Sequence, residues 1–184
     1  MASLLTVWTG DGSGYAIAQT QPMKLAAVEG YYEGQNGAGL VAVGLLNPEK
    51  KTYDDGQDPF LFRIEIPKML SLLAERKVDA FVPGIKNIIE GGYELKDGTK
   101  ALSAAEKIEK GKKAIAALAT YRTAKKEGDE AAAKEAYTTL QENVPYFGYG
   151  YIKDVNQLVP NVPLNFYAFR VMVILGGYFI LFFI

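Results

Sequence analysis

The C-terminal apolar run is the feature that most constrains the fold of this chain. From Pro163 to Ile184 the sequence reads PLNFYAFRVMVILGGYFILFFI. A transmembrane helix needs roughly 20 mainly apolar residues, so this run predicts a membrane span over 163–184. Arg170 lies inside it, and an ionisable residue within a span is costly and commonly functional. We therefore do not expect an ordinary soluble domain.

Composition excludes several classes of function. The chain has 184 residues, a formal net charge of -1, no histidine and no cysteine. A near-neutral charge argues against nucleic acid as the main partner. Without cysteine the chain has neither disulfides nor thiolate metal sites. Without histidine, a haem or zinc bound by imidazole would need that ligand from another segment or chain.

The N-terminus, MASLLTVWTG, lacks the basic region and long apolar core of a secretory signal. Residues 1–9 are apolar but short, and we interpret them as the end of a preceding membrane helix. This interpretation favours a chain cut from a longer membrane protein. The alternative is a soluble domain with a C-terminal anchor.

The region 10–100 reads as a mixture of helix and strand. The GDGSG segment at 10–14 predicts a turn. Pro22 near the start and Gly34 at the end predict a helix over 22–33, capped by Gln21 or Thr20.

Two strands and two short helices are expected next. The runs LVAVGLL at 40–46 and FLFRIEI at 60–66 predict strands, and the second alternates in polarity. Pro67 and Pro83 each predict the start of a short helix.

The region 101–162 is a helical insertion followed by an aromatic return segment. Ser103 and Glu106 have capping-box spacing, and Gly128-Asp129 interrupts the Ala/Lys/Glu-rich run. These features predict an αα-hairpin. Its narrow apolar stripe suggests a peripheral lid, with a partner-docking coiled coil as the alternative. The predicted fold class is α+β, mostly helical, with a short β-hairpin, the αα-hairpin and a transmembrane helix.

Lys24 and Glu29 form the first group with candidate chemistry. Five residues of helix separate them by about 140° around the axis, so they are not the i,i+4 pair that laces a solvated helix. They flank the apolar stretch LAAV. Lys24 as a donor and Glu29 as a proton acceptor could grip a polar molecule with two oxygens. Two ordinary surface charges are the alternative.

Met172 is the centre of the second group. Ala168, Met172 and Gly176 are spaced by four and share one face of the predicted span. The small residues would leave a recess around the thioether, and methionine is a known axial ligand of haem. The alternative is a helix-packing face with methionine as gap filler.

Several motifs together resemble one family. The chain contains GDGSGY, the stretch QPMKLAAVE, the strand FRIEIP, the YGY segment and the later FRVM. In this combination the chain resembles the quinol-binding loop (Q-loop) and the following membrane helix of subunit I of cytochrome bd quinol oxidases, over nearly its whole length.

The resemblance implies a quinol site. In that family the lysine and glutamate of the K-L-A-A-x-E motif are required for quinol oxidation, which makes Lys24 and Glu29 the expected catalytic residues. Gln21 and Asp11 are expected to line the same site. The substrate would be ubiquinol or menaquinol.

The resemblance also implies a haem site. The methionine of the F-R-x-M motif, Met172 here, is an axial ligand of the low-spin b-type haem, and Arg170 is expected close to that haem. The histidine that completes the ligation is absent from this chain. The family's high-spin haem b and haem d use ligands outside it.

The resemblance therefore implies part of a quinol:oxygen oxidoreductase, inactive as a fragment. Its division would be 1–9 for the end of a membrane helix, 10–100 for the quinol part of the Q-loop, 101–162 for the insertion and return, and 163–184 for the span. Expected partners are the bilayer, the rest of subunit I and subunit II. The parent would be multi-pass in the bacterial cytoplasmic (inner) membrane, with this loop on the extracytoplasmic side. The alternative is a membrane-anchored binding or scaffolding module without catalysis.

Overall fold

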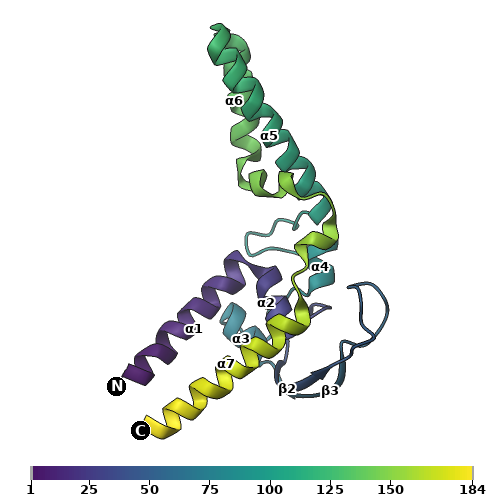
Figure 1. Ribbon diagram of the computed structural model, residues 1–184, viewed down its shortest axis with the longest axis vertical. Helices are drawn as coiled ribbons and strands as arrows, with labels where there is room; N and C mark the ends of the chain where they lie inside the picture. Colours follow the sequence, from purple (N-terminus) through teal and green to yellow (C-terminus); the bar gives the residue numbers. More distant parts are fainter. Residues whose placement is uncertain (1, 184) are drawn as a thin grey trace. The chain divides into compact units, whose positions relative to one another are not determined.

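A computed structural model describes residues 2–183, apart from the side chains of residues 2–4 and 7 (Figure 1). The chain is mostly helical, as predicted. It divides into two compact units. Unit 1 contains Met1–Ile88 and Val159–Ile184, and unit 2 contains Ile89–Leu158.

The first helix contradicts the predicted turn. Helix α1 runs from Ala2 to Thr20 and passes through the GDGSG segment without a break. The glycines lower its intrinsic helix propensity, but tertiary contacts hold the helix in place. Asp11 pairs with Arg76 at 2.5 Å, and the Gln19 side-chain amide donates to the carbonyl of Ala74 at 2.8 Å. Both partners belong to α3, Met69–Glu75, or its C-cap.

Helix α2 covers Pro22–Glu29 and ends at Glu29 rather than at the predicted Glu33. Gly30 takes the left-handed conformation, with φ of 62°, and its N–H caps the last turn. A side chain there would also meet the ring of Phe60 at 2.9 Å. Gln21 occupies the N-cap position, but its side chain makes no capping hydrogen bond. The Thr20 hydroxyl donates back to the carbonyl of Ala16 instead.

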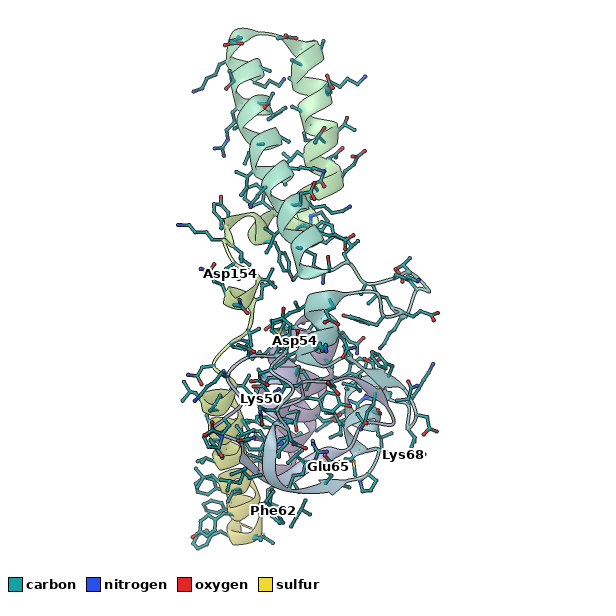
Figure 2. All side chains as sticks on the ribbon, turned by 90° about the vertical axis from the view of Figure 1, so that its right-hand side faces the viewer. Lys50, Asp54, Phe62, Glu65, Lys68 and Asp154 are labelled. Carbon is teal, nitrogen blue, oxygen red and sulfur yellow. The ribbon has the colours of Figure 1, made fainter. Side chains whose placement is uncertain are left out.

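The two predicted strands are confirmed. Strands β2, Leu40–Leu46, and β3, Phe60–Ile66, pair antiparallel with register irregularities near both ends of β2. Phe62 points away from the body of unit 1 and is 57 % exposed, whereas Glu65 lies on the other face of the strand (Figure 2). A second, minimal pair joins β1, Gln35–Asn36, to β4, Phe81–Val82.

The core of unit 1 lies between these elements. One cluster joins the hairpin to the C-terminal helix, and its members are Val41, Leu46, Phe60 and Phe166. A second cluster lies beneath α3 and contains Ala18, Ala38, Leu70, Ala74 and Val82. Helix α3 follows Pro67, and α4, Ile85–Glu90, follows Pro83, as predicted.

Unit 2 is built on the predicted αα-hairpin. Helices α5, Ala104–Glu127, and α6, Glu130–Asn143, pack against each other. The capping box is present, because Ser103 and Glu106 exchange hydrogen bonds across the first turn. Asp129 caps α6 through the N–H of Ala132. The return segment forms two 3₁₀ helices, η1 at Val144–Tyr151 and η2 at Val155–Leu158.

A glycine contact seats η1 against α5, and it gives a first prediction. A Cβ on Gly111 would clash with the backbone nitrogen of Gly150 and would lie 2.5 Å from the carbonyl oxygen of Tyr146. We expect Gly111→Ala to destabilise unit 2 by about 1–3 kcal/mol, because overpacking outweighs the helix propensity that alanine gains. Thermal unfolding of the purified protein measures this effect.

Gly148→Ala is the matched control for that prediction. Gly148 belongs to η1, the 3₁₀ helix that also contains Gly150, and a Cβ at Gly148 meets no atom within 4 Å. Its effect should stay within about 0.5 kcal/mol. Equal destabilisation by the two alanines would contradict the close-approach argument.

Helix α7, Val162–Phe183, is the predicted span, and Ile184 lies outside the described residues. Among the described residues it is the one helix long and apolar enough to cross a membrane. Its first turns are packed in unit 1, where Val162 and Phe166 are buried. From Val171 onward most of its apolar side chains are exposed. Its C-terminal end lies on the same side of unit 1 as the start of α1 (Figure 1).

Candidate functional site at the junction of α2 and α7

Glu29 is the last residue of α2 and lies buried against α7. Only 3 % of its surface is exposed. Ala26 and Ala27 are also buried, and their small side chains let α2 pack closely on its neighbours α1 and α7. The LAAVE stretch therefore places the carboxylate of Glu29 in the interior of unit 1. An ionised carboxylate there needs a counter-charge and hydrogen bonds.

Arg170 of α7 provides both. Its Nη2 donates to Oε2 of Glu29 at 2.6 Å, and its Nη1 donates to Oε1 at 3.4 Å. The side chains are 11 % and 3 % exposed, respectively. Two nitrogens of the guanidinium thus donate to the two oxygens of one carboxylate. This bidentate geometry fixes the orientation of the carboxylate and also supplies its counter-charge.

Two aromatic rings fix the guanidinium. The central carbon of the Arg170 guanidinium lies 4.6 Å from the ring centroid of Phe166 and 5.3 Å from that of Phe169. Phe166 in turn packs edge-on against Phe60 of β3, with centroids 5.5 Å apart. The Nε of Arg170 is buried and has no hydrogen-bond partner among the described residues. The arginine is therefore held by cation–π contacts on its faces and by Glu29 at its tip.

Two opposing effects act on the ionisation of Glu29. Burial raises the pKa of the Glu29 carboxyl, while the hydrogen bonds and charge of Arg170 lower it. Burial is the larger effect, so the pKa lies above its usual range. A carboxylate with this balance is suited to taking up a proton.

The other residues predicted for the quinol site lie at exposed positions on α1, at the N-cap of α2 and in the first turn of α2. Lys24 is exposed, and Glu29 is bound by Arg170 rather than by Lys24. Gln21 is exposed at the start of α2. Asp11 lies on α1, where hydrogen bonds from Arg76 lower the pKa of its carboxyl.

Met172 lies on an outward face of α7. It is 59 % exposed, and Ala168 and Gly176, one turn away on either side, are exposed too. Nothing lies within 4 Å of a Cβ added at Gly176. The thioether is therefore accessible beside a helix surface without bulk, as an axial ligand to a planar macrocycle requires. The described residues hold no cluster of histidine, cysteine, aspartate and glutamate that could bind a metal ion.

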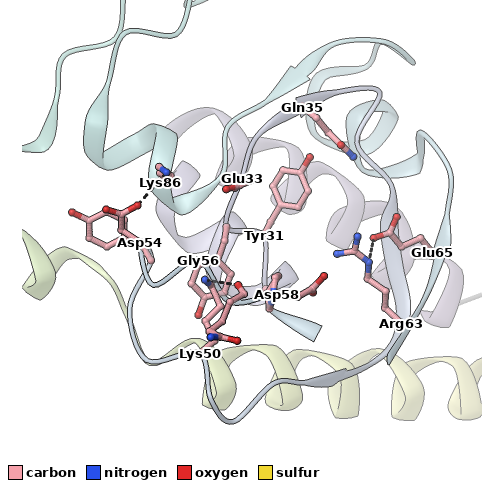
Figure 3. Close-up of a pocket in the computed structure, with 15 residues that line it drawn as sticks. Tyr31, Glu33, Gln35, Lys50, Asp54, Gly56, Asp58, Arg63, Glu65 and Lys86 are labelled. Carbon is pink, nitrogen blue, oxygen red and sulfur yellow. Dashed lines mark hydrogen bonds and ion pairs between the residues drawn. The ribbon is translucent and has the colours of Figure 1, made fainter. Parts of the chain in front are cut away.

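A cavity of about 400 Å³ opens beside this junction and was not predicted (Figure 3). Gly30 reaches its wall, and its aromatic lining is Tyr31, Tyr32 and Tyr53. Burial raises the pKa of Tyr31 to about 12, so this phenol stays neutral. None of the residues that the sequence predicts for the quinol or haem site lines this cavity.

The basic side chains of the cavity are neutralised by nearby acids. The three ion pairs are Lys50–Asp55, Arg63–Glu65 and Lys86–Asp54. The basic side chains that line the cavity are therefore all paired, and its wall also carries the carboxylates of Glu33 and Asp58 beside the aromatic surface.

The ion pair between Glu29 and Arg170 was missed because sequence analysis placed the two residues in separate groups. They are far apart in the chain, and no spacing rule connects them. A signal was nevertheless present. Ionisable residues within membrane helices commonly pair with one another, and Glu29 follows an apolar stretch that buries it.

These features define a class of protein: a compact unit that packs on the first turns of an apolar helix of membrane-spanning length, with a buried ion pair between them. Comparison with protein families gives the particular assignment. The family model for cytochrome bd terminal oxidase subunit I matches residues 1–184. The chain therefore belongs to the cytochrome bd oxidase subunit I family.

Individual relatives agree with this assignment. Cytochrome bd-II ubiquinol oxidase subunit 1 of Escherichia coli (strain K12) is 29% identical over 199 residues, which cover 98% of this chain and 34% of the relative. A Bacillus subtilis (strain 168) protein, named a cytochrome bd menaquinol oxidase subunit I, is 35% identical over 83 residues, covering 45% and 17%. The chain thus spans about a third or less of the length of these relatives.

A solved structure is also similar. The bd oxidase from Geobacillus thermodenitrificans matches with 23% sequence identity and a TM-score of 0.39, covering 95% of this chain and 34% of that one. The family assignment does not rest on this match.

Proposed function

We propose that this chain supplies the quinol-oxidation site and one haem ligand of a terminal oxidase that reduces oxygen to water. The observation that supports this proposal most is the buried Glu29, which lies on the K-L-A-A-x-E motif and is held by Arg170 of the apolar helix. The ion pair therefore joins Glu29, the candidate proton acceptor at the end of α2, to α7, the helix that bears Met172. Membership of the cytochrome bd oxidase family supports the same class of reaction.

Glu29 has the central role in this proposal. Oxidation of a quinol releases two protons, and the Glu29 carboxylate accepts one of them. Lys24 holds the second oxygen and stabilises the phenolate as it develops. Because Lys24 is exposed on α2, it reaches the substrate from the solvent side of the helix. Gln21 and Asp11 would complete the binding site for ubiquinol or menaquinol.

Met172 would hold a low-spin b-type haem from one side. Its exposure and the open surface at Gly176 fit a macrocycle there, and a histidine outside this chain would be the second ligand. A haem held there would supply an electron acceptor for quinol oxidation. The high-spin haem b and haem d would be bound outside this chain.

The cellular setting follows from the same proposal. The rest of subunit I, subunit II and the bilayer surround α7, in the bacterial cytoplasmic (inner) membrane. The Q-loop, residues 10–162, would face the extracytoplasmic side, where protons from quinol would be released. The exposed apolar side chains of α7 from Val171 onward are consistent with lipid or further membrane helices around it.

Substitution of the two catalytic candidates tests the proposal. In the oxidase that contains this chain, Glu29→Gln and Lys24→Ala should each lower quinol-driven oxygen uptake by about 100-fold or more, because each removes a group that acts on the substrate. The haem absorption spectrum should persist. Glu33→Gln and Lys51→Ala, both at exposed positions, are matched controls and should retain activity. Wild-type uptake by Glu29→Gln would refute the assignment.

A further inference from the structure

Glu29 has one charged neighbour that governs its state. Within the described part of the chain, the most extensive helix contacts of α2 are with α1 and α7. The ionisable groups of α1 are Asp11, which is paired with Arg76, and Tyr15. Those of α7 are Tyr167, Arg170 and Tyr178, and α2 itself adds the exposed Lys24. Of these groups, Arg170 is the one that hydrogen-bonds to Glu29.

Arg170 is built into a rigid support. Phe166 is fully buried, and its ring contacts both Phe60 and the guanidinium. The hydroxyl of the adjacent Tyr167 accepts a hydrogen bond from the N–H of Leu46 at 3.0 Å. The first turns of α7 are thus fastened to the hairpin on one side and to α2 on the other. A guanidinium held in this way fixes the direction in which the carboxylate of Glu29 can point.

We propose that Arg170 is a positioning residue of the quinol site, which keeps the Glu29 carboxylate ionised and oriented for proton uptake and couples its protonation to the helix that carries Met172. This inference rests on the proposed function, and it adds no chemical step to it. A proton released from quinol passes to Oε of Glu29 as before. Before that transfer, Arg170 keeps the Glu29 carboxylate deprotonated and holds its oxygens in a fixed orientation.

The consequence is a link between the two helices. When Glu29 gains a proton, the ion pair is lost and the buried guanidinium is left without its counter-charge. Such an unpaired buried charge is costly, so loss of the proton from Glu29 to water, which re-forms the ion pair, is favoured. Because Arg170 lies two residues before Met172, less than one turn of α7 separates the charge change from the proposed haem ligand.

The test is a set of variants of the complete oxidase: Arg170→Gln, Arg170→Lys, Glu29→Gln and the double variant Arg170→Gln/Glu29→Gln. Removing the cation should raise the pKa of Glu29, because a nearby opposite charge lowers a carboxyl pKa by about 1–3 units. The acid limb of quinol-driven oxygen uptake should therefore move to higher pH by about one unit or more in Arg170→Gln. Arg170→Lys, which keeps the charge, should stay near the wild-type limb with a lower maximum rate.

Infrared spectroscopy gives a readout that does not depend on activity or bound haem. At neutral pH, Arg170→Gln should show a protonated carboxyl band that is absent from wild type and from the double variant. The double variant should also be no more than about threefold slower than Glu29→Gln, because coupled residues are not additive.

Two results would overturn the inference. One is a loss of rate in Arg170→Gln that is equal at all pH values, with no new carboxyl band, since this would indicate a merely structural arginine. The other is full additivity of the two substitutions. Failure of the proposed function would look different: Glu29→Gln would retain wild-type uptake, while the carboxyl band of Arg170→Gln would still report the coupling.

Discussion

Replacing Met172 with leucine in the oxidase that contains this chain is expected to remove the absorption of the low-spin b-type haem. Leucine has nearly the volume of methionine but no sulfur, so α7 should keep its shape while the proposed haem ligand is removed. Met172 is 59 % exposed on a face with Ala168 and Gly176. The packing of unit 1 should therefore not change. Reduced-minus-oxidised spectra of the purified enzyme measure the effect.

Met23→Leu is the matched control for this substitution. Met23 lies in the first turn of α2 and is partly buried, so the same chemical change is made away from the proposed haem face. Its spectrum should be that of the wild type. If the low-spin band survives in Met172→Leu, the axial ligand is another residue and the proposed haem role of this chain is wrong.

The second large effect is expected from Phe166→Ala, which should destabilise unit 1 by about 3–5 kcal/mol. Phe166 has no exposed surface and belongs to the cluster of Val41, Leu46 and Phe60. Truncation leaves a cavity between the hairpin and α7. It also removes a ring from the guanidinium of Arg170, 4.6 Å away. Thermal unfolding of the oxidase in detergent gives the change in stability.

Phe62→Ala is the matched control, because it removes an aromatic ring that is exposed rather than buried. Phe62 is on the same strand as Phe60 but is 57 % exposed, so this truncation should cost about 1 kcal/mol or less. Phe166→Leu, which keeps much of the volume, should fall between the two. A stability change for Phe166→Ala no larger than that for Phe62→Ala would contradict the core assignment.

Local sequence patterns predicted most of the secondary structure. The strands at 40–46 and 60–66 were found because their composition and bounding turn residues are local signals. The capping box at Ser103 and the cap at Asp129 were found for the same reason. The errors came where distant contacts intervene. Residues 10–14 are helical because α1 packs on α3, and α2 ends early because Gly30 adopts the left-handed conformation beside Phe60.

The sequence by itself determined the membrane-length helix, the motifs of the family and the residue types available for chemistry, because each is a property of composition and spacing. The tertiary structure alone decided which of those residues act on one another. It left Lys24 exposed, buried Glu29, and joined Glu29 to Arg170, which lies in another helix far along the chain. The physical reason is burial: once packing removed the Glu29 carboxylate from water, its state depended on the charge that folding brought beside it.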